Sequence, residues 1–158
     1  MKNLAILALA LFPLSLPAQA QAPGVQLGML TCAIDGGVGF FIGSSKNMRC
    51  TFRPANNRLP QQSYNGVMNK YGVDIGATSG GVLQWLVLAP SLDVYAPNVL
   101  SGNYVGANAE ATVAWGVGAN VLFGGGNSIA LQPISVQGQT GLNAALTVGE
   151  LSLRGAAT

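Results

Sequence analysis

Apolar and polar positions alternate in short runs along most of this chain, and glycine and turn residues separate the runs. The clearest run spans residues 111–123, in which every second side chain from Ala111 to Phe123 is apolar and the intervening ones from Thr112 to Asn120 are small. Successive side chains of a strand point to opposite faces, so a period of two predicts β-strands. This run would make an unusually long strand, and Gly116 and Gly118 are expected to let it bend.

Further strands are predicted where a short run rich in Val, Ile, Leu and aromatic residues lies between turn residues. They span residues 25–34, 38–43, 48–53, 71–75, 82–89, 129–136 and 142–153. The run 82–89 is apolar on both faces apart from Gln84, which indicates a central strand. About eight strands predict an all-β fold, either a compact antiparallel β-barrel or a sandwich. We favour the barrel, because the chain has few charges to protect open sheet edges.

The first twenty residues have the pattern of a secretory signal peptide. Lys2 supplies a positive start, residues 4–16 form a short apolar stretch, and Ala18-Gln19-Ala20 matches the small-x-small cleavage pattern. An uncleaved membrane anchor is the alternative, but the stretch is shorter than the ~20 apolar residues that span a bilayer. We therefore expect cleavage before Gln21, export to the periplasm or cell envelope, and a single β domain over residues 21–158.

The chain has two cysteines, Cys32 and Cys50. An exported protein meets an oxidising compartment, so the two thiols are expected to form a disulfide. Closing a loop of this length would stabilise the fold by about 3 kcal/mol in the chain-entropy model. A zinc site is not expected, because the chain has no histidine and two thiolates fill only half of a tetrahedral shell.

Catalytic equipment is sparse in this sequence. There is no histidine to act as a general base, and the positions of the five carboxylates in the sequence do not identify a catalytic pair. The sequence Ser44-Ser45-Lys46 could pair a serine with a lysine base only if the lysine were buried, and its neighbours are typical of a turn. The glycine clusters of the chain lack the Gly-Lys-Ser/Thr sequence that ends a phosphate-binding loop. We predict no enzyme activity, no cofactor and no metal.

One segment carries most of the basic residues. Apart from Lys2, the chain has six basic and five acidic residues, and five of the basic ones fall between positions 46 and 70 with no acid among them. These residues are Lys46, Arg49, Arg53, Arg58 and Lys70. Aromatic residues are interleaved with them, and residues 53–60 have the composition of a long loop. The segment predicts an anion-binding patch for lipid headgroups or an acidic glycan, or else a merely solvated face. The near-neutral overall charge does not predict nucleic-acid binding.

Several motifs resemble one known family. They include Gly28-Met29-Leu30-Thr31-Cys32, Cys50-Thr51-Phe52, Gly102-Asn103-Tyr104-Val105-Gly106 and Gly118-Ala119-Asn120-Val121. Together they resemble the domain-of-unknown-function family numbered 992, which comprises small exported proteins of Gram-negative bacteria. The resemblance covers nearly all of the chain after residue 20 and implies a cell-envelope setting, but no activity.

Three functions remain open from the sequence. The first is a non-enzymatic binding or structural β-domain that contacts a partner, such as another envelope protein, through its loops. The second is a peripheral binder of anionic lipid or glycan through residues 46–70. The third is a small outer-membrane β-barrel, which long alternating strands and low charge favour, although the chain does not end in an aromatic residue.

Overall fold

A single closed sheet forms the framework of the protein. The computed structural model describes residues 24–35, 45–71, 81–106, 120–124, 129–134 and 148–156, with the side chains of Lys70 and Tyr71 excepted. This part contains eight strands and one 3₁₀ helix: β1 (Val25–Ile34), β2 (Lys46–Pro54), β3 (Gln62–Tyr71), β4 (Val82–Ala89), η1 (Leu92–Val94), β5 (Gly102–Gly106), β6 (Leu122–Gly124), β7 (Ile129–Pro133) and β8 (Val148–Gly155). None of the described residues forms a helix with the length and apolar character needed to cross a bilayer.

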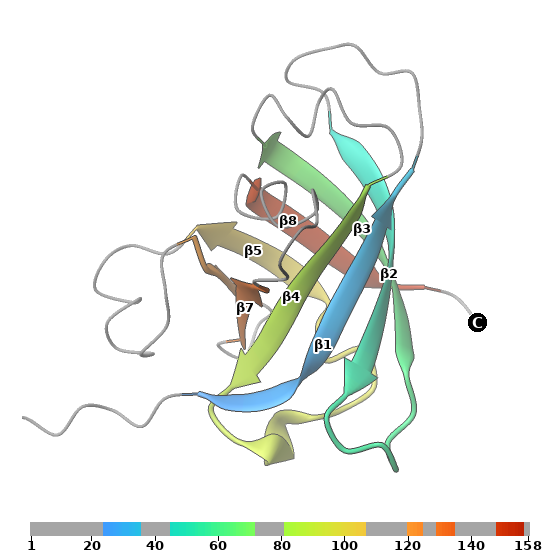
Figure 1. Ribbon diagram of the computed structural model, residues 1–158, viewed down its shortest axis with the longest axis vertical. Helices are drawn as coiled ribbons and strands as arrows, with labels where there is room; N and C mark the ends of the chain where they lie inside the picture. Colours follow the sequence, from blue (N-terminus) through green and yellow to red (C-terminus); the bar gives the residue numbers. More distant parts are fainter. Residues whose placement is uncertain are drawn as a thin grey trace, which may run out of the picture.

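The strands close into a barrel in the order β1-β2-β3-β8-β5-β6-β7-β4, and β4 pairs again with β1. Every neighbouring pair is antiparallel. Figure 1 shows β4, β1, β2 and β3 side by side, with β8, β5 and β7 in the opposite wall. The predicted all-β fold is confirmed, and the barrel is the form observed. Closure pairs every strand on both sides and so removes the open edges.

The alternation of apolar and polar residues predicted the bounds of some strands more accurately than those of others. β1 and β4 have the predicted bounds, and β2 contains the predicted run 48–53. The prediction of one uninterrupted strand through Phe123 is wrong, because Asn120 has a φ of 66° in a turn and β6 begins at Leu122. The left-handed conformation at Asn120 ends any extended run there. Residues 1–20, 38–43, 72–75, 111–119 and 135–147 lie outside the described residues.

The barrel interior is apolar. On β2 the side chains of Met48, Cys50 and Phe52 are buried, while Asn47, Arg49, Thr51 and Arg53 between them are exposed. Aromatic and aliphatic side chains from the other strands fill the same space; the largest are Trp85, Tyr64, Tyr104, Leu30 and Met68. Burying each side chain of this size contributes roughly 1.5–3 kcal/mol, so the interior is the main source of stability.

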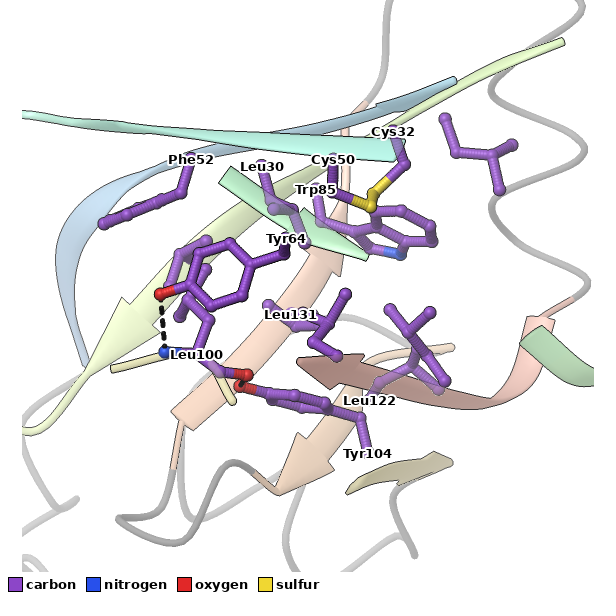
Figure 2. Packing of buried hydrophobic residues seen from close by; sticks show 14 of the residues in the cluster. Leu30, Cys32, Cys50, Phe52, Tyr64, Trp85, Leu100, Tyr104, Leu122 and Leu131 are labelled. Atoms are coloured by element: carbon purple, nitrogen blue, oxygen red, sulfur yellow. Dashed lines mark hydrogen bonds between the residues drawn. A yellow bond between two sulfur atoms is a disulfide. The ribbon is translucent and has the colours of Figure 1, made fainter. Parts of the chain in front are cut away.

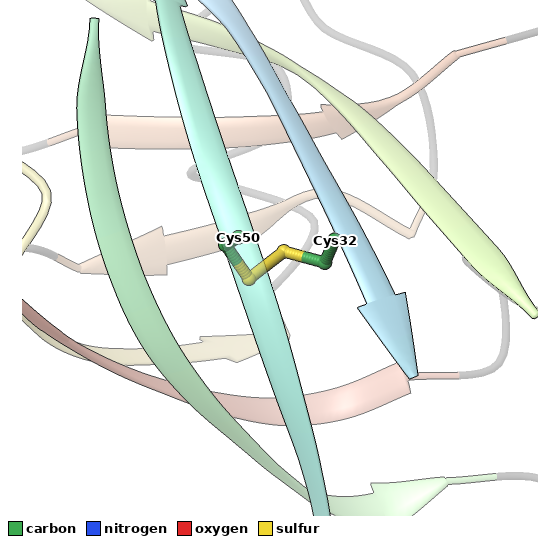
Figure 3. Close-up of a disulfide and its surroundings, with 2 residues drawn as sticks. All are labelled: Cys32 and Cys50. Atoms are coloured by element: carbon green, nitrogen blue, oxygen red, sulfur yellow. A yellow bond between two sulfur atoms is a disulfide. The ribbon is translucent and has the colours of Figure 1, made fainter. Parts of the chain in front are cut away.

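The predicted disulfide between Cys32 and Cys50 is present inside the barrel (Figure 3). The two residues face each other in the register of β1 and β2, with Cα atoms 4.0 Å apart, and both are buried. Gly66 on β3 leaves room for them, because a Cβ atom at position 66 would lie 3.2 Å from Cys50 Sγ. The disulfide therefore joins two neighbouring strands from within the core.

The connection from β4 to β5 closes one end of the barrel, and its anchor is Leu100. Figure 2 shows the Leu100 backbone between two buried tyrosines: the Leu100 N–H donates to Tyr64 Oη at 3.2 Å, and Tyr104 Oη donates to the Leu100 carbonyl at 2.8 Å. The Tyr64 hydroxyl in turn donates to Gln62 Oε1. Both polar groups of a fully buried residue thus have partners, as the interior requires.

Candidate functional site

The predicted basic segment is divided between different surfaces of the barrel. Arg49 and Arg53 are exposed on the outer face of β2, whereas Lys46 is buried on the side that carries Met48 and Cys50. Arg58 is exposed in the loop between β2 and β3, and Lys70 lies near the end of β3. The loop spans residues 55–61, so Arg53 and Pro54 belong to the strand and not to the predicted loop. Lys46 and Arg58 therefore do not share the surface that carries Arg49 and Arg53.

Barrel closure adds a different arginine to the outer face. In the strand register, Arg49 of β2 lies opposite Asn65 of β3, and Asn65 lies opposite Arg154 of β8. Strands are ~4.8 Å apart, so the backbones at Arg49 and Arg154 are about 10 Å apart. Arg53 lies on the same side of β2, about 13 Å from Arg49 along the strand. We call this exposed set, Arg49, Arg53 and Arg154, the arginine face.

Small polar side chains lie between the arginines. Thr51 and Ser63 are exposed partners in the β2–β3 register, and Ser152 of β8 donates a hydrogen bond from Oγ to Asn103 Oδ1 at 2.7 Å. Hydroxyl and amide groups can donate to or accept from a polar ligand. The arginine face therefore combines positive charge with hydrogen-bonding groups on a rigid sheet.

Only one acid contacts the arginine face within the described part of the chain. Arg49 Nε lies 3.4 Å from Asp35 Oδ1, and both side chains are largely solvated. An exposed pair of this kind contributes ~0–1 kcal/mol, because water and salt screen it. No described residue forms a salt bridge with Arg53 or Arg154. Among the described residues, the face thus keeps a net positive charge.

A groove of about 440 Å³ adjoins the arginine face where β5 begins and β8 ends. Its lining consists of Ser101, Gly102, Asn103, Leu153, Arg154 and Gly155. Gly102 has a φ of 148°, which side-chain-bearing residues rarely adopt, so glycine is required at this point of the wall. The groove has the volume of a small-ligand pocket and a mainly polar lining.

The tyrosines that hold Leu100 are the titratable groups most affected by the fold. Burial raises the pKa of Tyr104 above its ordinary value, and the neighbouring Tyr64 adds to the effect. Burial also raises the pKa of Tyr64, although the hydrogen bond from Leu100 acts in the opposite direction. Both hydroxyls stay protonated at neutral pH and have structural partners, which fits a role in closing the barrel. The described residues contain no group of three or more Cys, Asp or Glu side chains that could hold a metal ion.

Comparison with known proteins places the chain in a family. A family model described as "Protein of unknown function (DUF992)" matches residues 12–154, a range that includes the eight described strands up to Arg154. The chain belongs to the DUF992 family. The resemblance found in the sequence is thereby confirmed. No curated protein matches the chain.

Among solved structures, this DUF992 protein is similar to the crystal structure of a β-barrel-like, uncharacterised protein from Brucella abortus. The two chains share 25% sequence identity, and the match covers 82% of this chain and 73% of the other, with a TM-score of 0.47.

Sequence reasoning missed Arg154 and the groove residues of this DUF992 protein. The alternation Leu151-Ser152-Leu153-Arg154 does indicate that Arg154 lies on an outer face. However, the neighbour of that face depends on the pairing of β8 with β3 and β5, which are distant in sequence. No local signal specifies such pairings.

Proposed function

We propose that this protein is an exported, non-catalytic binding protein of the cell envelope, and that its ligand is an anionic glycan held on the arginine face. The observation that carries the proposal is the convergence of Arg49, Arg53 and Arg154 on one outer surface, with Asp35 as their one acidic contact among the described residues. A rigid face with several guanidinium groups about 10–13 Å apart fits a ligand with several separated anionic groups.

Two features support export. The first twenty residues have the order of a signal peptide, and the buried Cys32–Cys50 disulfide fits an oxidising compartment. N-terminal sequencing of protein recovered from a periplasmic extract is expected to begin at Gln21. Recovery in the cytoplasmic fraction, with Met1 as the first residue, would contradict export.

The absence of catalysis is proposed from the sequence. The chain has no histidine, and the usual bases and nucleophile pairs are missing. The buried tyrosine hydroxyls have backbone and side-chain partners and do not face solvent. Turnover of ester, glycoside or peptide substrates by the purified protein would contradict this part of the proposal.

The polarity of the described strands argues against a barrel that spans a membrane. Transmembrane barrels carry an apolar band outside and polar groups inside. Here β2 and β3 expose Arg49, Asn65 and Ser63 on the outside, while the interior is packed with apolar side chains. Placing the arginine side chains in hydrocarbon would cost several kcal/mol.

A glycan fits the arginine face better than a membrane surface does. Proteins that bind at a lipid interface usually insert apolar side chains beside their basic ones. Of the exposed large apolar residues among those described, only Met29 is the direct register partner of an arginine on this face. Thr51, Ser63 and Asn65 instead offer hydrogen-bonding groups of the kind that contact sugar hydroxyls.

Binding to an acidic polysaccharide tests the proposal. We expect the purified mature protein to bind immobilised polygalacturonate at low salt, to bind neutral dextran negligibly, and to lose polygalacturonate binding at about 0.5 M NaCl, where charges are strongly screened. The triple variant Arg49→Gln, Arg53→Gln, Arg154→Gln should lose the interaction.

The variant Arg58→Gln is the matched control, because it removes the same charge from the exposed β2–β3 loop and not from the face. It should keep most of the binding. Equal binding by the triple variant and the wild-type protein would overturn the proposal, as would stronger binding to anionic lipid vesicles than to the polysaccharide.

A further inference from the structure

Hydrogen-bonding side chains lie on both sides of the groove beside Arg154. Arg154 is exposed on one side and Asn103 on the other, while the buried side chain of Leu153 lies beneath. In the register of β5 and β8, Gly102 pairs with Leu153, so Ser101 lies beside Arg154 at the next position. The groove therefore continues the row formed by Arg49, Asn65 and Arg154.

Two side-chain oxygens of the groove lining each accept a hydrogen bond within the protein. Ser101 Oγ accepts a hydrogen bond from the Gly155 N–H at 3.1 Å, which leaves its own hydroxyl proton to donate. Asn103 Oδ1 accepts from Ser152 Oγ at 2.7 Å, which leaves its Nδ2 group to donate. Together with the guanidinium of Arg154, these groups make the groove rich in donors.

Among the residues that the structure describes, no carboxylate lines the groove. Glu150 lies on the same strand as Arg154 but four residues away, which corresponds to about 13 Å. An excess of donors with a guanidinium and no acid complements an anionic oxygen, above all a carboxylate that Arg can bind through two parallel hydrogen bonds.

We propose that this groove is the subsite for one acidic sugar unit, whose carboxylate binds Arg154 and whose neighbouring hydroxyls accept hydrogen bonds from Ser101 and Asn103. The inference rests on the proposed glycan-binding function and names the part of the ligand that gives it specificity. Arg49 and Arg53 then contact the following units through charge, while the groove distinguishes a uronic acid from a neutral sugar.

A short oligosaccharide tests the subsite apart from the wider face. Isothermal titration calorimetry with trigalacturonate is expected to show binding, and maltotriose, which lacks carboxylates, should not bind. Arg154→Gln should weaken trigalacturonate binding about tenfold or more, as expected for the loss of a charged hydrogen bond. Arg154→Lys should weaken it less, because it keeps the charge but loses the bidentate geometry.

Arg58→Gln is the matched control, since it removes the same charge from the exposed β2–β3 loop and lies neither on the arginine face nor in the lining of the groove. It should change trigalacturonate affinity less than twofold. Equal effects of Arg154→Gln and Arg58→Gln on the trisaccharide, or equal binding of maltotriose, would overturn the subsite and leave the proposed function standing. Failure of both the polymer and the trisaccharide to bind would overturn both.

Discussion

Arg154 of β8 lies directly opposite Asn65 of β3 on the outer surface of the barrel. The two residues are far apart in sequence, and Arg49 of β2 lies on the other side of Asn65. The charge of the arginine face is thus assembled by barrel closure and not by the basic segment alone.

The ion pair between Arg49 and Asp35 lowers the positive charge of the arginine face. We expect Asp35→Asn to strengthen binding to polygalacturonate severalfold, because the guanidinium of Arg49 becomes available to the ligand. The free energy of unfolding should change by less than about 1 kcal/mol, since the pair is exposed. Binding assays and urea unfolding on the same protein check both parts. Weaker polygalacturonate binding by the variant would contradict this expectation, because it would show that Asp35 favours ligand binding by the arginine face.

The Cys32–Cys50 disulfide should contribute substantially to stability. The bonded residues are 18 positions apart, so its loss in the double variant Cys32→Ala, Cys50→Ala should lower the free energy of unfolding by about 3 kcal/mol. Guanidinium unfolding measures the change. A reductant should lower the unfolding midpoint of the wild-type protein in the same way. It should leave the midpoint of the double variant unchanged. An unchanged midpoint for the double variant would contradict this expectation.

The buried tyrosines should make the fold sensitive to alkaline pH. Burial raises the pKa of Tyr104 and of Tyr64 above about 10, the value in an unfolded chain, so the folded state holds protons that the unfolded state releases. The stabilising effect is complete below pH 10 and is lost as the pH rises from there towards the folded pKa values. Each group contributes a slope of up to about 1.4 kcal/mol per pH unit.

The variant Tyr104→Phe isolates one of these two groups. At neutral pH it should be less stable than the wild-type protein by about 1–3 kcal/mol, because the buried Leu100 carbonyl loses its donor. Above pH 10 the difference in stability between the wild-type protein and the variant should shrink. The variant has no ionisable group at this position and so does not lose the stability that the wild-type protein loses there. Urea unfolding between pH 7 and pH 11.5 checks the trend, and a difference that stays constant over this range would contradict it.

Close packing of β5 against β6 depends on a missing side chain at Gly124. A Cβ atom at position 124 would approach the backbone carbonyl oxygen of Asn103 far more closely than atoms can. Gly124→Ala should therefore destabilise the barrel by about 1–3 kcal/mol or more. Gly106→Ala is the control, because a Cβ atom there would meet only the Gly149 carbonyl oxygen, at 3.9 Å. Similar thermal midpoints for the two variants would show that the strands can separate without loss of stability.

The sequence predicted the parts of the fold that depend on local alternation. β1 and β4 were located because apolar side chains occupy their inner positions at regular intervals. β3 was missed except for its last residue, because its inner positions include Gln62 and Gly66, so the strand lacks a continuous apolar stripe. Glycine at this point leaves room for Met48 and the disulfide, and that close packing is visible only after β2 and β3 are paired.

The candidate site also shows how far local alternation alone can predict the structure. Alternation along β2 separates Lys46, which shares a face with Cys50, from Arg49, which lies on the other face. Counting charges over the segment 46–70 concealed that separation. Arg154 and Ser101 could not be added from sequence, because the order of strands in the closed barrel places Arg154 beside β3 and Ser101 beside Arg154. Non-local pairing therefore decides which charges form a surface.

Mapping the ligand contact by NMR tests the central claim most directly. In a titration of ¹⁵N-labelled protein with trigalacturonate, we expect the backbone amides of Asn65, Ser101, Asn103 and Arg154 to shift, and those on the outer face of β4, such as Leu86, to stay unchanged. Shifts confined to β2, β3, β8 and β5 would support the arginine face and its groove as the binding site. Shifts centred on β4 and β7, or none at all at low salt, would contradict the account.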